Sequence, residues 1–167
     1  MFVNCKNLKS IDIPASVTTL GRWIFEGCAN LKDITLHEGL TTLSASTFYG
    51  CGITEIDIPT TVSEIPDYCF GETKLTTITI PSTVKSVGFG AFERCPLKFE
   101  NNKLVIPSKV ESIGERAFSD CKSITSIELP EGLKEIKPTA FGNIENISEI
   151  VLPSTLEKMA DCAFLLL

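Results

Sequence analysis

The sequence predicts an α/β repeat solenoid, with short parallel strands stacked along one side and short helical or 3-10 turns elsewhere. Three observations support this fold. Phenylalanine recurs at intervals of 22 to 26 residues along the 167-residue chain. Proline recurs in step with it, and pairs of aliphatic residues lie between the two. We therefore expect a single array over residues 1–167, made of about seven repeats of 22–26 residues.

The first predicted element of each repeat is a very short strand that ends at a proline. Its two aliphatic residues are separated by one residue, so both side chains point one way while the residue between them points the other way. Proline closes the strand because it lacks a backbone N–H and fixes its own φ. The pairs are Ile11/Ile13, Ile34/Leu36, Ile56/Ile58, Ile78/Ile80, Leu104/Ile106, Ile127/Leu129 and Ile150/Leu152.

A second aliphatic pair and a turn complete the repeat. The members of this pair are three residues apart, as in Val110 and Ile113. A polar or glycine turn follows, and then a small residue and phenylalanine, as in residues 114–118. We interpret this last segment as one helical turn, too short to be an independent helix. The phenylalanine column comprises Phe2, Phe25, Phe48, Phe70, Phe92, Phe118, Phe141 and Phe164.

One such repeat cannot bury its own aliphatic side, whereas a stack of repeats can. Each strand would pair with the next at about 4.8 Å, and each phenylalanine would lie on its neighbours. One repeat gains four residues between Leu97 and Leu104, which predicts a surface loop, often found beside the binding face of such arrays. Phe99 in this loop lies outside the phenylalanine column. It is either a ligand contact or a side chain folded back over its own loop.

The motif Val-x-x-Ile-Gly-x-x-Ala-Phe-x-x-Cys at residues 110–121, followed by Ile-x-x-Ile-x-Leu-Pro at residues 124–130, resembles the BspA-like class of leucine-rich repeats. The resemblance covers essentially the whole chain. It implies a right-handed leucine-rich-repeat superhelix with its strands on the concave side. It also implies a cell-surface or secreted protein of host-associated bacteria or protozoan parasites. Some members of this class bind extracellular matrix or plasma proteins such as fibronectin and fibrinogen, so a protein ligand of this kind is expected.

Neither end of the sequence carries a polar cap, which solenoids normally need to shield their last core layer. Apolar residues stand at Met1-Phe2 and at Leu165–Leu167. We therefore expect a fragment of a longer array, or end-to-end self-association. The longest apolar run, residues 163–167, is far shorter than the roughly 20 residues of a membrane-spanning helix, and no signal peptide is recognisable in this segment.

The composition favours a binding protein over an enzyme. A formal charge of −6 argues against nucleic-acid binding, which usually requires a basic stripe. His37 is the only histidine and occupies a proline position at a strand end, so we expect a solvated side chain rather than a general base. Gly88-Phe89-Gly90 is too short to match a phosphate-binding loop. No catalytic residue and no cofactor is predicted.

The seven cysteines do not have the spacing of a metal site. Five of them follow a phenylalanine by three residues and so lie a repeat or more apart, unlike the C-x-x-C pairs of zinc sites. We interpret them as free thiols that fill the core. Disulfides between neighbouring repeats are the alternative, because stacking would bring such cysteines close enough. The five are Cys5, Cys28, Cys51, Cys95 and Cys121.

The strand residues that face away from the core form the one arrangement that indicates binding. These two columns hold six acids and one lysine, which accounts for most of the net charge. A surface of one charge sign steers partners of the opposite sign, so we expect a basic or amide-rich protein surface as the ligand. The alternative is the ordinary polarity of an exposed sheet. The candidate protein-binding residues are Asp12, Asp33, Glu55, Asp57, Glu128, Glu149 and, in the inserted loop, Phe99.

The sequence thus predicts a non-catalytic protein–protein interaction module of a cell-surface or secreted, adhesin-like protein that binds host or matrix proteins through its concave face. The alternative is an intracellular leucine-rich-repeat scaffold. A secretory signal upstream in the gene, together with thiol titration of the unfolded chain, would distinguish the two.

Overall fold

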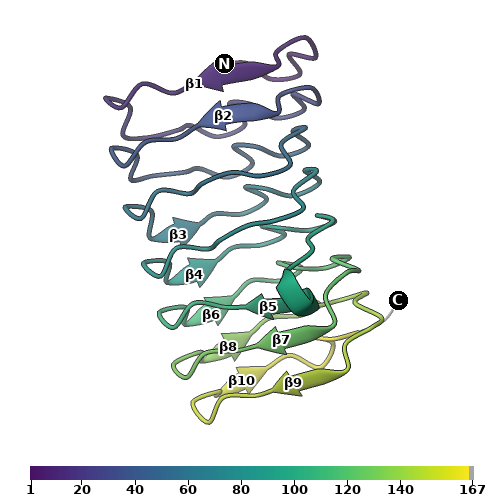
Figure 1. Cartoon of the computed structure of the whole chain (residues 1–167). Coiled ribbons are helices and arrows are strands. Elements are labelled where there is room, and N and C mark those ends of the chain that lie inside the picture. Colours follow the sequence, from purple (N-terminus) through teal and green to yellow (C-terminus); the bar gives the residue numbers. More distant parts are fainter. Residues whose placement is uncertain (166–167) are drawn as a thin grey trace.

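The computed structural model describes residues 1–165, whose successive turns stack into one column (Figure 1). The chain is a β-solenoid in which every strand pairing is parallel. Its strands are β1 (Ser10–Asp12), β2 (Asp33–Thr35), β3 (Glu64–Ile65), β4 (Ser86–Val87), β5 (Lys103–Val105), β6 (Ser112–Ile113), β7 (Ser126–Glu128), β8 (Glu135–Ile136), β9 (Glu149–Val151) and β10 (Lys158–Met159). The 3-10 turn η1 (Glu100–Asn102) is the only helical element assigned within residues 1–165.

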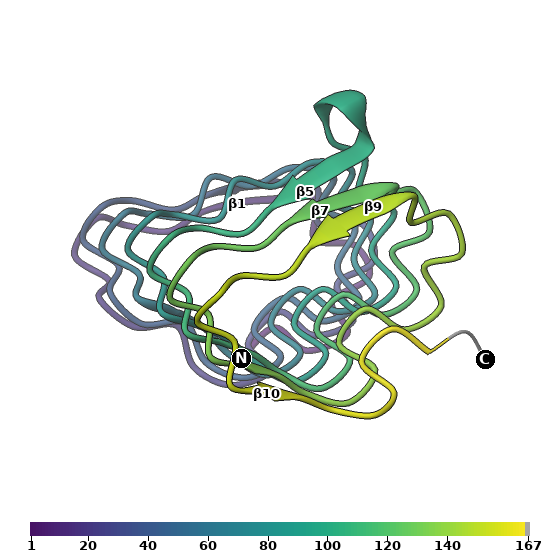
Figure 2. The same ribbon diagram turned by 90° about the horizontal axis from the view of Figure 1, so that it is seen from below.

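The strands occupy two sides of the solenoid, as the view along the stack shows (Figure 2). The predicted strands before proline form the first side, where β1 pairs with β2 and β7 lies between β5 and β9. Their register aligns equivalent positions, with Ile127 opposite both Leu104 and Ile150. The turns at residues 56–58 and 78–80 lack assigned strands but keep the predicted alternation of buried and exposed side chains.

The second aliphatic pair of the repeat contributes a ladder that was not predicted. It runs in the order β10-β8-β6-β4-β3 on the second side. Each of its strands is two residues long, and the aliphatic member of β3, β4, β6 and β8 is buried. Two ladders on opposite walls enclose the core more completely than the single sheet expected from the sequence.

The segment around each phenylalanine is not helical, which corrects the prediction of a helical turn. For the six phenylalanines from Phe25 to Phe141, the residues two before and two after have positive φ, for example 57° at Arg116 and 61° at Asp120. Arg116, Phe118 and Asp120 donate their N–H groups to the following turn of the solenoid, with 2.8 Å from Phe118 N to Ala140 O. The N–H groups between them close β-turns within their own coil. A helix would satisfy its donors locally, whereas this conformation binds one coil to the next.

The phenylalanine column forms the continuous inner stack that the sequence predicts. Neighbouring rings lie 5.2 to 5.8 Å apart between centroids, with interplanar angles of 5° to 13°. The six rings from Phe25 to Phe141 are at most 1% exposed, whereas Phe2 at the first turn is 40% exposed. The aromatic stack therefore lies at the centre of a core shared by all described turns.

Four cysteines that follow a phenylalanine by three residues are buried, as predicted for core fillers, and all seven cysteines are free. These thiols have a second role that the sequence did not indicate. Each contacts the carbonyl oxygen of the phenylalanine in the preceding coil, at 2.9 Å from Cys51 Sγ to Phe25 O. Thr73 replaces cysteine in one coil, and its hydroxyl donates to Phe70 O at 2.8 Å. Thr73 donates to the phenylalanine of its own coil, and Ile144 at the equivalent position has no donor, so the hydrogen bond to the preceding coil is specific to the four buried cysteines.

Candidate protein-binding surfaces

The structure gathers the six predicted acids on one exposed side. We call this side the strand face and define it by β1, β2, residues 55–57, residues 77–79, β5, β7 and β9. All six acids are exposed. They alternate with the buried aliphatic residues as expected, and the pairing places Glu128 opposite Val105 and Val151.

Two of these acids already contact a side chain of a neighbouring coil. His37 Nε2 lies 3.1 Å from Asp12 Oδ1, so the histidine that was expected to be free in solvent is hydrogen-bonded. Lys103 forms an ion pair with Glu128 across the β5–β7 pairing. Both contacts are largely exposed and contribute little stability, but they occupy carboxylate oxygens that a ligand would otherwise meet. Within residues 1–165, Asp33, Glu55, Asp57 and Glu149 form no ion pair.

Three of the unpaired acids surround a hollow in the strand face. The hollow has a volume of about 420 Å³ and is open to solvent. Its charged lining residues are three acids, Asp33, Glu55 and Asp57, and one cation, Lys32. The hydroxyl-bearing residues Thr35, Thr77 and Thr79 also line it. Carboxylates and hydroxyls on neighbouring coils provide acceptors for amide and ammonium donors of a ligand. The predicted acidic surface is therefore concentrated at this point.

The inserted loop borders a second hollow on the same face. The loop carries η1 and rises beyond the strand face next to β5 (Figure 2). This hollow has a volume of about 550 Å³, and its apolar lining comes from Ile78, Ile80, Phe99, Val105 and Pro107. Ile78 and Thr79 also line the acidic hollow, so the two are adjacent.

Phe99 combines the two roles that the sequence left open. Its side chain is half-buried and packs against the core, as a residue folded back over its loop would. It also lines the apolar hollow. Val105, 54% exposed on β5, lines that hollow as well. The inserted loop therefore places an aromatic and an aliphatic contact next to the acids.

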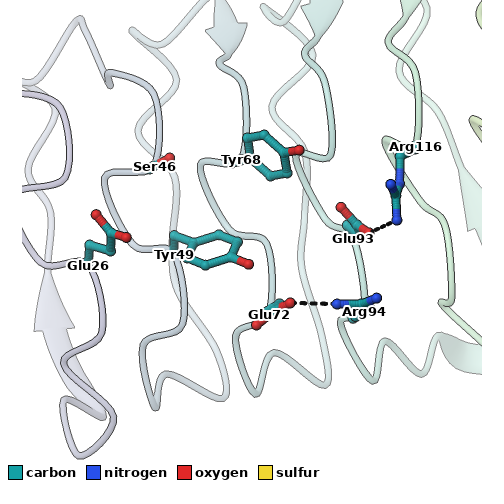
Figure 3. Close-up of a pocket in the computed structure, with 8 residues that line it drawn as sticks. All are labelled: Glu26, Ser46, Tyr49, Tyr68, Glu72, Glu93, Arg94 and Arg116. Carbon is teal, nitrogen blue, oxygen red and sulfur yellow. Dashed lines mark hydrogen bonds and ion pairs between the residues drawn. The ribbon is translucent and has the colours of Figure 1, made fainter. Parts of the chain in front are cut away.

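A third hollow lies beside the phenylalanine column, and none of its residues was predicted. We call it the tyrosine pocket; it has a volume of about 460 Å³ and is lined by Glu26, Ser46, Tyr49, Tyr68, Glu72, Glu93, Arg94 and Arg116 (Figure 3). The sequence signal that was available is the position of the chain's two tyrosines in adjacent repeats: Tyr49 directly follows Phe48, and Tyr68 stands two residues before Phe70.

Ion pairs and aromatic contacts shape the tyrosine pocket. Arg94 donates to Glu72 at 2.7 Å, and Arg116 donates to Glu93 at 2.6 Å. The rings of Tyr49 and Tyr68 are 5.8 Å apart and nearly perpendicular. Burial, and then a hydrogen bond with Glu72, raise the pKa of Tyr49 to about 12, so its phenol is neutral at physiological pH.

The described part of the chain holds neither a metal-ligand cluster nor a membrane-spanning helix. Residues 1–165 contain no group of three or more histidine, cysteine or acidic side chains placed to hold a metal ion. The same residues include no helix with the length and hydrophobicity to span a membrane.

Comparison with known proteins identifies a repeat family and several structural relatives. The family model described as the BspA type leucine rich repeat region matches residues 1–101 and 98–166, in six copies. No curated protein matches the sequence. A leucine-rich repeat protein from Eubacterium ventriosum is 31% identical, with a TM-score of 0.75 over 94% of this chain and 42% of that one.

Two further crystal structures share the fold. A leucine-rich repeat protein from Bacteroides ovatus is 28% identical, with a TM-score of 0.74 over 95% of this chain and 39% of that one. The T. pallidum leucine-rich repeat protein is 27% identical, with a TM-score of 0.58 over 95% of this chain and 63% of that one. The chain thus spans about two fifths of the length of the first two proteins.

Proposed function

Since the chain belongs to the BspA-type leucine-rich repeat family, we propose that it is a non-catalytic protein-binding module of a cell-surface or secreted, adhesin-like protein. Its ligand is a host or extracellular matrix protein, bound through the strand face. The proposal includes the right-handed superhelix and the concave strand face that the family resemblance implies. The location at the surface or outside the cell rests on that resemblance.

The observation that carries this proposal is the pairing of an acidic and an apolar hollow on the strand face. Asp33, Glu55 and Asp57 hold unpaired carboxylates within the described chain, and Phe99 and Val105 stand beside them. A protein segment with basic or amide groups next to an apolar side chain complements both. The acids would steer its approach and the apolar contacts would slow its release.

A capture experiment with matrix and plasma proteins, including fibronectin and fibrinogen, tests the proposal. The double variant Asp33→Lys/Asp57→Lys reverses charge at the acidic hollow, and we expect its ligand binding to fall at least tenfold. The matched control is Glu64→Lys/Glu157→Lys, which makes the same change in charge at exposed positions outside the strand face. Binding of the natural chain should also weaken as salt is raised from 50 to 500 mM, because screening shortens the reach of exposed charges.

The variant Phe99→Ser tests the contribution of the apolar hollow apart from that of the acidic hollow, because Phe99 lines only the apolar one. We expect this variant to weaken binding mainly through faster dissociation, while charge reversal should mainly slow association. Equal binding by the natural chain and the Asp33→Lys/Asp57→Lys variant would reject the strand face as the binding surface.

One observation favours the intracellular scaffold as a second candidate. All seven cysteines are free, and thiols are maintained in this state in reducing compartments. Thiol titration of the unfolded natural protein, together with the sequence upstream in the gene, decides between them. Seven reactive thiols and no secretory signal would favour the scaffold.

A further inference from the structure

We propose that the tyrosine pocket is a second binding site, which takes the cationic side chain of a lysine or arginine from a partner protein. The pocket shares no lining residue with the two hollows of the strand face. The inference is therefore independent of the function proposed above. It rests on how the pocket is formed, on its aromatic walls and on its balance of charges.

The two tyrosine rings can take their positions because the following coil carries glycine next to each ring, where other coils carry side chains. Gly71 occupies the position of Glu26 and Tyr49, directly after a phenylalanine. A Cβ at Gly71 would lie 3.1 Å from the Tyr49 ring, and one at Gly90 would lie 2.6 Å from the Tyr68 ring. Each tyrosine thus lies over a glycine of the following coil. A side chain at either glycine would displace the ring that lines the pocket.

The aromatic walls suit a cation with an apolar stem. Tyr49 and Tyr68 are nearly perpendicular, and Phe89 extends the cluster at 4.9 Å from Tyr68. Ring faces attract ammonium and guanidinium groups, and the attraction increases when the site is partly desolvated. Both tyrosines are half-buried. The methylene groups of a lysine or arginine can pack against the rings while the charged end reaches the carboxylates.

The charges lining the pocket exclude an anion and favour a cation. Three glutamates line it against two arginines, and each arginine is engaged by a glutamate. Arg94 is also 4.0 Å from Asp120, so both of its sides face carboxylates. Glu26 forms no ion pair within residues 1–165. An anionic ligand would have to displace existing pairs, whereas a cation adds to an excess of acids.

Figure 3 shows how these groups converge. The hydroxyl ends of Tyr49 and Tyr68 point toward the side on which Glu72 and Glu93 lie. Arg94 lies beyond Glu72 and Arg116 beyond Glu93, so the glutamates stand between the aromatic rings and the guanidinium groups. The arginines hold the two glutamates in place.

The experiment uses tyrosine-specific isotope labelling, because the chain has only two tyrosines. Three blocked pentapeptides with glycine at every position except the third are titrated against the natural chain; the third residue is lysine, norleucine or glutamate. We expect the lysine peptide to shift both tyrosine ring signals in a saturable way, with a dissociation constant in the millimolar range. The norleucine and glutamate peptides should bind at least fivefold more weakly.

Matched variants then locate the site. Tyr68→Leu should weaken lysine-peptide binding at least fivefold. Tyr68→Phe keeps the aromatic ring, so this variant should bind the lysine peptide as tightly as the natural chain does. Trp23→Leu is the control, because Trp23 occupies the same repeat position as Tyr68, is 46% exposed and lies outside the pocket. The Asp33→Lys/Asp57→Lys variant should bind the lysine peptide normally, so the two proposed sites fail or succeed separately.

Three outcomes would overturn the inference. Equal shifts with the norleucine peptide would show apolar contact alone, and tighter binding of the glutamate peptide would show an anion site. Non-saturating shifts with lysine up to 100 mM would show that the pocket is only a structural ion-pair cluster.

Discussion

Individual side chains beside the core act through their hydrogen-bonding groups as much as through their volume. Cys95 Sγ lies 3.0 Å from Phe70 O and Cys121 Sγ lies 3.2 Å from Phe92 O. These carbonyls also accept a backbone N–H within their own coil, and Phe70 O accepts the Thr73 hydroxyl as well, so the thiol is an additional donor to the same oxygen. Burial raises the pKa of the Cys51 thiol to about 12 and that of Cys95 to about 11. The buried thiols are therefore protonated donors and poor nucleophiles at neutral pH.

We predict that the free energy of unfolding falls as pH rises above about 9. The ordinary thiol pKa of 9.0 applies to the unfolded chain, whereas the folded chain holds the Cys51 proton up to about pH 12. Between these values the unfolded state binds fewer protons than the folded state. Over this pH range each such thiol lowers the free energy of unfolding by up to about 1.4 kcal/mol per pH unit. Below pH 9 its contribution to stability is fully present.

Cys51→Thr tests this prediction, because threonine cannot titrate there but retains a hydrogen-bond donor, as Thr73 does. Urea unfolding at several pH values between 8 and 11 measures the effect. The variant should lose stability less steeply with pH than the natural chain. Parallel pH dependences would show that Cys51 does not contribute to the linkage.

At the level of the elements, the turn segment before each phenylalanine packs against the turn of the adjacent coil, and this packing decides whether a side chain fits there. The residue four positions before phenylalanine is glycine in three coils, at Gly21, Gly88 and Gly114. A Cβ at Gly114 would lie 2.5 Å from the Gly88 carbonyl carbon, whereas one at Gly21 would meet no atom within 4 Å. The same repeat position is thus crowded by backbone in one coil and open in another.

Gly114→Ala should destabilise the chain by about 1–3 kcal/mol, because backbone atoms must shift to accept the methyl group. Gly21→Ala is the matched control at the equivalent position and should change the stability by less than about 0.5 kcal/mol or increase it slightly. Denaturant unfolding of both variants provides the comparison. Equal losses would indicate a general requirement for backbone freedom at this position.

For the whole molecule, a one-directional set of hydrogen bonds joins the coils along the phenylalanine side. Backbone N–H groups donate to carbonyls of the following coil, as from Phe25 to Thr47 at 3.0 Å and from Phe70 to Ala91 at 2.9 Å. The peptide dipoles on this side therefore point the same way along the stack and add, as they do in a helix. Each coil contacts mainly its neighbours, so stability is expected to be the sum of coil and interface terms.

Hydrogen exchange tests this organisation. The amides of Phe48, Phe70 and Phe92 should exchange as slowly as those of the β-ladders, although they belong to no strand or helix. The exposed turn at residues 108–109 should exchange rapidly, and the Phe2 amide at the first coil should exchange faster than its interior equivalents. Rapid exchange at Phe70 would contradict a cooperative hydrogen-bond network on this side.

The sequence by itself determined the period of the array, the phenylalanine stack, the side on which the acids lie and the position of the inserted loop. It could do so because stacking converts each repeated sequence position into a column, so a residue's place follows from its register. Only the tertiary structure decided the second strand ladder and the left-handed turn residues. The latter include arginine, tyrosine and glycine at one position, and so have no residue signature. The tertiary structure also decided the contacts of Asp12 with His37 and of Glu128 with Lys103, and it formed the tyrosine pocket. These features depend on residues that do not repeat along the chain and that meet only when neighbouring coils stack.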